Sequence, residues 1–95
     1  MYKRIVTTKA FAKSWKRLPK PIQHLVNEKI NLLAQNQAHP SLKVHRVMRL
    51  RDKDVWICYI GVSMRLLYQR HKDAIYLQEV GAHGVIDNVH QRHFG

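Results

Sequence analysis

The sequence predicts an α+β domain in which a two-helix hairpin packs on a curved, mainly antiparallel sheet of four to five strands, ahead of a short C-terminal segment. Two observations support this fold class. Apolar residues recur at helical spacing between residues 11 and 33, and the spacing changes to every second residue between residues 42 and 80. A chain of 95 residues without repeats or a long linker is expected to form a single domain over residues 1–95.

The first expected elements are a short strand and two helices. Residues 2–7 include β-branched side chains and form a strand candidate that joins the same sheet as the later strands. Thr7 or Thr8 can cap the first helix, which ends at Pro19. Pro21 suits the first turn of a second helix that runs to about Asn36. The apolar stripes of these helices are Phe11, Trp15 and Leu18, then Ile22, Leu25, Val26, Ile30 and Leu33.

After a turn at residues 38–41 the pattern is that of an antiparallel meander. Val55–Ile60 is almost continuously apolar, which indicates that both of its faces are covered in places. Gly81 ends the last long strand and places His83 at its C-terminal edge. The tail, Val85–Gly95, is expected to contain a short helical segment. The expected strands are Leu42–Leu50, Val55–Ile60, Met64–Arg70 and Ala74–Val80.

The charge of the chain is strongly unbalanced. Seventeen Lys and Arg residues oppose six Asp and Glu residues, for a net charge of +11. Such an excess favours a polyanionic partner, either nucleic acid or an acidic protein, over a basic surface that only aids solubility. The single cysteine, Cys58, lies in an apolar run, so we expect a buried thiol and a reducing compartment. Neither a signal-peptide core nor a membrane span is apparent, which predicts a cytoplasmic protein without a membrane partner.

Three residues could carry out RNA cleavage without a metal. One group must remove a proton from a ribose 2′-OH, another must protonate the leaving 5′-oxygen, and a cation must stabilise charge on phosphorus. His45 and His83 can transfer protons near neutral pH, and the guanidinium of Arg65 matches phosphate oxygens. Taken singly, a histidine in a strand is more often structural, and Arg65 could equally form an ion pair.

A metal site is the competing use of the seven histidines. The sequence contains no His-Glu-x-x-His motif and no paired Cys and His at zinc-binding spacing. His90 and His93 could share a helix face near the C-terminus, but two histidines alone do not make a site. We therefore expect neither a metal nor another cofactor.

Four stretches, in this order and spacing, carry a family resemblance. They are Phe11-x-x-x-Trp15-x-x-Leu18-Pro19, His39-Pro40-Ser41-Leu42-Lys43-x-His45, the strand pair Val55–Ile60 and Met64–Tyr68, and Leu77-Gln78-Glu79-Val80-Gly81-x-His83. From about Tyr2 to Asp87 the chain resembles toxins of the RelE/ParE superfamily of type II toxin–antitoxin systems.

The resemblance implies a fold, an activity and a partner. Members have a helical hairpin packed on one face of a curved antiparallel sheet. RelE- and YafQ-like members are ribonucleases that cut mRNA in the ribosomal A site, and a cognate antitoxin silences each of them. We expect that partner to lay an acidic segment over the basic face. Two alternatives remain: a ParE-like inhibitor of DNA gyrase without a catalytic site, and an inactive module that binds nucleic acid or antitoxin.

The resemblance also implies site residues. His45 and His83 match catalytic histidines of YafQ-like members, and Arg65 matches an arginine that RelE-like members use against the scissile phosphate. The chain departs from YafQ-like members at Tyr59, where they have histidine, and at Ser63, where they have aspartate. Where they have an aromatic residue, four places after the final histidine, this chain has Asp87. Tyr59 or Phe94 could replace that ring, and Asp87 could orient His83. RNA phosphates are expected to contact Lys43, Arg46, Arg49 and Arg51.

Overall fold

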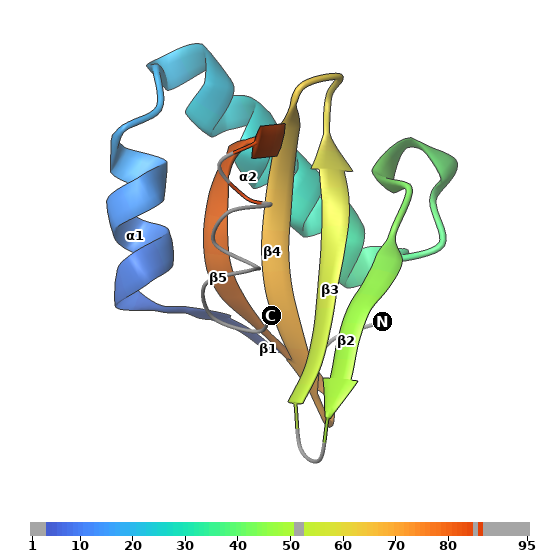
Figure 1. Cartoon of the computed structure of the whole chain (residues 1–95). Coiled ribbons are helices and arrows are strands. Elements are labelled where there is room, and N and C mark those ends of the chain that lie inside the picture. Colours follow the sequence, from blue (N-terminus) through green and yellow to red (C-terminus); the bar gives the residue numbers. More distant parts are fainter. Residues whose placement is uncertain (1–3, 51–52, 85, 87–95) are drawn as a thin grey trace.

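The computed structural model describes residues 4–50, 53–84 and 86, without the side chains of residues 48–50 and 53. Within these residues one sheet contains five strands in the order β1-β5-β4-β3-β2 (Figure 1). β1 is parallel to β5, and the other neighbours are antiparallel. The predicted α+β fold class is confirmed. The elements are β1 (Arg4–Thr7), α1 (Lys9–Lys16), α2 (Lys20–Gln35), the short 3-10 helix η1 (Pro40–Leu42), β2 (His45–Leu50), β3 (Lys53–Ile60), β4 (Met64–His71) and β5 (Ala74–Ala82).

The two helices meet at their short linker and diverge from it (Figure 1). Thr8 caps α1, because its hydroxyl accepts a hydrogen bond from the backbone N–H of Phe11 at 3.2 Å. Near the linker, the indole N–H of Trp15 donates to the Asn27 side chain at 3.2 Å, and the Gln23 amide donates to the Trp15 carbonyl at 3.1 Å. Farther from the linker, α1 follows β5 while α2 crosses behind the middle of the sheet (Figure 1).

The core lies between the helices and one face of the sheet. Val26 and Leu33 of α2 pack there with Cys58 of β3, Leu66 of β4 and Leu77 of β5. A smaller cluster covers part of the opposite face and contains Val55, Ile57, Leu67 and Ile86. The continuous apolar run in β3 thus reflects burial on both faces, as its sequence indicates.

Two hydroxyl groups complete the outer edge of β5. β1 pairs only with residues 74–77 of β5, so β5 extends well beyond its parallel neighbour. There the Thr8 hydroxyl donates to the Leu77 carbonyl at 2.7 Å, and the Val80 N–H donates to the buried Ser14 hydroxyl at 3.1 Å. These bonds give partners to backbone groups of β5 that would otherwise be buried without any. They also hold α1 against the strand that leads to His83.

The boundaries of the four later strands differ from the sequence-based expectation. β3 begins two residues early, at Lys53, and β4 ends one residue late, at His71. β2 begins at His45 rather than Leu42, because Pro40–Leu42 form a 3-10 turn and Lys43 adopts the left-handed conformation with φ 45°. β5 continues to Ala82, two residues past the expected Val80. In the part of the chain that the structure describes, neither helix has the length and apolar character that crossing a membrane would require.

Candidate active site

Pleat alternation brings the predicted catalytic residues to the sheet face opposite the helices. Cys58 and Ile60 of β3 belong to the cluster shared with the helices, so Tyr59 points the other way. Arg65 of β4 pairs with Tyr59 in register and shares its face. His45 begins β2 and His83 follows β5, on the two sides of this pair. The four side chains, with Ile57, line a cavity of about 80 Å³.

Arg65 is the most constrained side chain of the cavity. The residue is only 8% exposed, and no carboxylate of a described residue forms an ion pair with it. Its Nη1 donates to the carbonyl oxygens of Met64 at 2.8 Å and Val62 at 3.2 Å. Its Cζ atom lies 3.5 Å from the centroid of the Tyr59 ring. A buried guanidinium held by carbonyls and an aromatic face, without an acidic partner, is suited to bind an anion.

Tyr59 occupies the centre of the cation cluster. Lys43 precedes β2 and places its Nζ 5.5 Å from the Tyr59 ring centroid, while Arg65 approaches from β4. The His45 ring meets Tyr59 edge-to-face, with centroids 6.3 Å apart and an interplanar angle of 79°. Since the ring already contacts Arg65 at van der Waals distance, it holds that guanidinium in place.

Backbone carbonyls contact both histidine residues, at the ring of His45 and at the main chain of His83. Nδ1 of His45 lies 3.2 Å from the Lys43 carbonyl oxygen. When Nδ1 carries the proton it donates to this carbonyl, and Nε2 is then left to accept a proton from a ligand. The backbone N–H of His83 donates to the Ser63 carbonyl at 2.9 Å, and the His83 residue is exposed.

The turn between β3 and β4 connects Arg65 to His83. Gly61 has φ +69°, a conformation that favours glycine, and lets the chain reverse at this point. The next two backbone carbonyls accept hydrogen bonds from residues that line the cavity. The Val62 carbonyl accepts from the Arg65 guanidinium, and the Ser63 carbonyl accepts from the backbone N–H of His83. A three-residue turn therefore contacts both the guanidinium of Arg65 and the backbone of His83. Sequence reasoning treated this segment only as a link between strands.

The structure separates the predicted RNA-binding residues. Lys43 is exposed beside the cavity. Arg46 pairs in register with Trp56 and so points to the helix-covered face. There its Nε forms an ion pair with Asp54 at 3.0 Å, and its Cζ lies 4.9 Å from the Trp56 ring centroid. The backbone of Arg49 is in β2 but its side chain is not described, and Arg51 and Asp87 lie outside the described residues.

The buried thiol is not part of the site. Cys58 faces the helix-covered core, and burial raises its pKa from 9.0 to about 12. The thiolate needed for nucleophilic attack is therefore scarce near neutral pH. Among the described residues, no three His, Cys, Asp or Glu side chains are grouped so that they could hold a metal ion.

The geometry defines a class of site: two imidazoles and one buried guanidinium around a small cavity. Imidazoles can remove and donate protons, and the guanidinium can neutralise charge on a phosphoryl group. Sequence reasoning had weighed Tyr59 only as a substitute base-stacking ring and missed its contact with Arg65. That contact was accessible in principle, because a tight turn at residues 61–63 pairs residue 59 with residue 65.

Solved structures share this fold, in which two helices pack on one face of a five-stranded sheet. No family model matches the chain, and no curated protein sequence matches it. A chain of the archaeal RelE–RelB complex from Pyrococcus horikoshii matches with a TM-score of 0.73 and 20% identity, over 88% of this chain and 98% of that one. YafQ from Escherichia coli matches with a TM-score of 0.70 and 15% identity, over 86% and 94%.

A metal-bound toxin from Helicobacter pylori matches with a TM-score of 0.69 and 26% identity, over 90% of this chain and 99% of that one. The chain therefore has the fold of RelE- and YafQ-type toxins, as the resemblance in its sequence implies.

Proposed function

We propose that this protein is the toxin of a toxin–antitoxin pair and a metal-independent mRNA endoribonuclease. The observation that carries the proposal is the buried guanidinium of Arg65, which pairs with no carboxylate of the described residues and lies beside the imidazoles of His45 and His83. The fold shared with RelE and YafQ supports it. In the cell we expect the substrate to be mRNA in the ribosomal A site, and inhibition of translation in the cytoplasm to stop growth.

The reaction that suits these groups is an internal transesterification. One imidazole takes the proton of a ribose 2′-OH, whose oxygen forms a bond to the adjacent phosphorus. The bond from phosphorus to the 5′-oxygen breaks, and the other imidazole gives that oxygen a proton. Arg65 stabilises the added negative charge on the phosphoryl oxygens. The products are a 2′,3′-cyclic phosphate and a 5′-hydroxyl, so the protons balance without a metal or another cofactor.

A cognate antitoxin is the expected protein partner. Structures that share the fold include the E. coli DinJ–YafQ toxin–antitoxin complex, which matches with a TM-score of 0.68. The net charge of +11 favours a partner with an acidic segment. We propose that this segment covers the cationic cavity and excludes RNA, which neutralises the toxin.

His83→Ala tests the catalytic assignment. Removal of one proton-transfer group should lower the rate of mRNA cleavage by roughly 100-fold or more and relieve growth arrest on induction. His71→Ala is the matched control, because His71 is also exposed but ends β4 away from the cavity. Cleavage is measured by mapping RNA ends, and circular dichroism checks that both variants fold. Undiminished cleavage by folded His83→Ala would contradict the assignment.

The same proteins separate the alternative functions. A gyrase inhibitor would reduce DNA supercoiling by purified gyrase, and the loss of the His83 imidazole should leave that effect unchanged. An inactive binding module would neither arrest growth nor cut RNA. Growth arrest that depends on His83, with RNA ends carrying a cyclic phosphate, is expected only for the ribonuclease.

A further inference from the structure

A cluster of polar side chains lies where α2 leads into β2, outside the catalytic cavity. The Lys29 ammonium donates a hydrogen bond to the Ser41 hydroxyl at 3.1 Å. That hydroxyl lies 2.9 Å from Nδ1 of His39, and the Ser41 backbone N–H donates to the same nitrogen at 3.2 Å. Lys29, His39 and Ser41 are here called the Ser41 cluster, and none of them lines the catalytic cavity.

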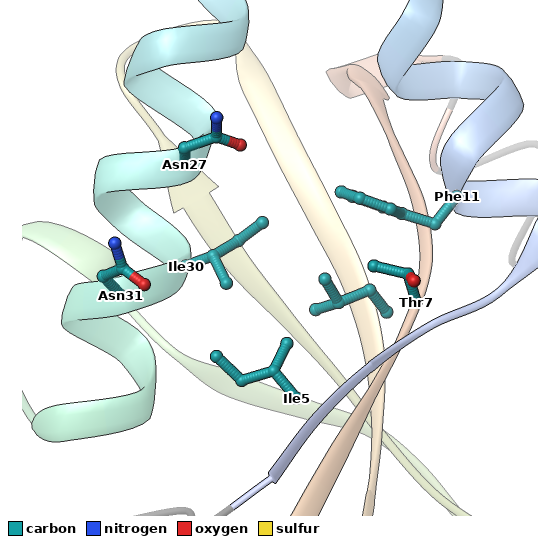
Figure 2. Close-up of a pocket in the computed structure, with 7 residues that line it drawn as sticks. Ile5, Thr7, Phe11, Asn27, Ile30 and Asn31 are labelled. Carbon is teal, nitrogen blue, oxygen red and sulfur yellow. The ribbon is translucent and has the colours of Figure 1, made fainter.

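Lys29 belongs to the side of α2 that faces η1. Figure 2 shows Asn27, Ile30 and Asn31 of α2 lining a pocket beside β1. Lys29 is two residues from each asparagine, which places it about 200° around the helix axis from both of them. Its ammonium therefore reaches η1 at the other edge of the sheet, where β2 begins (Figure 1).

The Ser41 cluster is held in place by buried neighbours. Leu42, the last residue of η1, and Ile30, which follows Lys29, are both buried in the core. His39 caps η1 through Nδ1, and its carbonyl accepts a hydrogen bond from the Leu42 N–H at 3.1 Å. Donors that are already positioned lose little conformational entropy when a ligand arrives, so this support favours binding.

The charge of Lys29 is not neutralised by a neighbouring acid. No carboxylate of a described residue forms an ion pair with it, and Glu28 projects about 100° away around the helix. An ammonium carries three N–H donors, of which Ser41 takes one. Because Nδ1 of His39 accepts from a backbone N–H, the proton of the neutral ring lies on Nε2, which is a further donor. The cluster is therefore suited to bind an oxyanion.

The Ser41 cluster and the catalytic cavity are close along the chain. Ser41 is followed by Lys43, which contacts the Tyr59 ring, and by His45, which lines the cavity. Since four positions separate Ser41 from His45, their Cα atoms are at most about 14 Å apart. One RNA strand in the cavity can therefore bring the phosphate of a nearby nucleotide to the cluster.

We propose that the Ser41 cluster binds a phosphate of the RNA strand away from the bond that is cut, which rests on the proposed function. The Lys29 ammonium and the His39 ring donate to the phosphate oxygens, and the Ser41 hydroxyl turns from His39 to do the same. An acidic protein segment is a poorer occupant. None of the exposed large apolar side chains of the described residues belongs to the cluster, so a protein segment would gain no apolar burial there.

The test compares a long and a short RNA ligand in the cleavage-deficient His83→Ala protein. The long ligand is a labelled strand of about ten nucleotides, followed by fluorescence anisotropy. The short ligand is a dinucleotide with a single phosphate, followed by NMR. Lys29→Gln should weaken binding of the long strand roughly five- to tenfold and make its slope of log K against log salt shallower by roughly 0.7. Affinity for the dinucleotide should not change, because the dinucleotide does not reach the cluster.

Two further variants make the test specific. Lys20→Gln is the matched control, because it removes the same charge from the exposed first turn of the same helix. It should leave both the affinity and the salt slope unchanged. Ser41→Asp places a carboxylate beside Lys29 from an exposed position, so it should weaken binding of the long strand at least as much as Lys29→Gln. Circular dichroism checks that each variant folds.

Several results would overturn the proposal. They are undiminished affinity of folded Lys29→Gln and Ser41→Asp for the long strand, an equal loss in Lys20→Gln, and an equal loss for the dinucleotide. A poly-glutamate peptide that shifts the Ser41 amide signal and binds more tightly than the RNA would assign the cluster to an acidic protein segment instead.

Failure of this proposal is distinguishable from failure of the proposed function. With His83 present, Lys29→Gln should raise KM for RNA cleavage and leave kcat unchanged. If the protein cuts RNA through His83 but Lys29→Gln has an unaltered KM, only the phosphate site fails. If Lys29→Gln weakens RNA binding while His83→Ala cuts as fast as the unaltered protein, the phosphate site stands and the catalytic assignment fails.

Discussion

At the scale of single residues, the unusual contact is between Tyr59 and Arg65. A charged guanidinium that is 8% exposed needs compensation. Among the described residues this comes from two carbonyls and an aromatic face, and no carboxylate pairs with it. An acidic partner would neutralise the charge that a phosphate requires. The aromatic face holds Arg65 without neutralising it, which explains how the site keeps a usable cation in a mostly buried position.

Tyr59→Leu should therefore lower kcat/KM for RNA cleavage by roughly tenfold or more, because a partly desolvated cation–π contact contributes about 1–2 kcal/mol. Tyr59→Phe keeps the ring and should retain activity within about threefold. NMR supplies a second readout. The Arg65 side-chain protons should be shifted upfield by the ring in the unaltered protein and in Tyr59→Phe, and the shift should disappear in Tyr59→Leu. Equal activity of the two variants would contradict this role for the ring.

At the scale of elements, α1 supports the strand that leads into the site. Its two hydroxyl groups, from Thr8 and Ser14, bond to the backbone of β5 where β1 no longer pairs with it. Without them, β5 would have unpaired backbone groups at Leu77 and Val80, six and three residues before His83.

Ser14→Ala should destabilise the protein by about 1–3 kcal/mol, because the Val80 N–H stays buried and loses its acceptor. Urea unfolding followed by tryptophan fluorescence measures the change. Ser41→Ala is a suitable control, since Ser41 is exposed and its loss should change the free energy of unfolding by less than about 0.5 kcal/mol. Similar effects of the two substitutions would show that the bond to Val80 is not important.

At the scale of the whole molecule, the distribution of charge follows the two faces of the sheet. Lys43 and Arg65 lie at the cavity, where both contact the Tyr59 ring. Arg46 lies on the other face, where it forms an ion pair with Asp54 and contacts the Trp56 ring. Cationic side chains therefore lie on both faces, and those at the cavity have no ion pair with a described residue.

This division predicts a specific salt dependence. In the cleavage-deficient His83→Ala background, the affinity for a labelled single-stranded RNA should fall steeply with KCl concentration, as measured by fluorescence anisotropy. Lys43→Ala should make the slope of log K against log salt shallower by roughly 0.7, the value for one lost phosphate contact. Lys13→Ala, on α1, should leave the slope unchanged. An unaltered slope in Lys43→Ala would remove Lys43 from the RNA-binding surface.

Most of the fold could be predicted from the sequence because its signals are local. Thr8 caps the first helix, Pro19 lies in the break before the second helix, and the change from helical to alternating periodicity marks the sheet. The face shared by Tyr59 and Arg65 follows from strand alternation and a short turn. These features depend on neighbouring residues, which a sequence displays directly.

Other features depend on contacts that local patterns do not encode. Lys43 adopts a left-handed conformation that its residue type does not favour, and this moved the start of β2. Arg46 could not be assigned to a face without knowing where β2 begins and bulges. The divergence of the helices results from packing against the sheet and has no signature in either helix.

The parallel pairing of β1 with β5 also governs the order in which the protein can assemble. The hydrogen bond from Thr8 to Leu77 joins residues 69 positions apart. During folding, β1 therefore cannot pair with the sheet until β5 is available. A nascent chain that has not yet released residues 74–83 lacks both the neighbour of β1 and the His83 imidazole. Under the proposed function, the unfinished chain is therefore not an active nuclease, and it cannot cut the mRNA on the ribosome that is synthesising it.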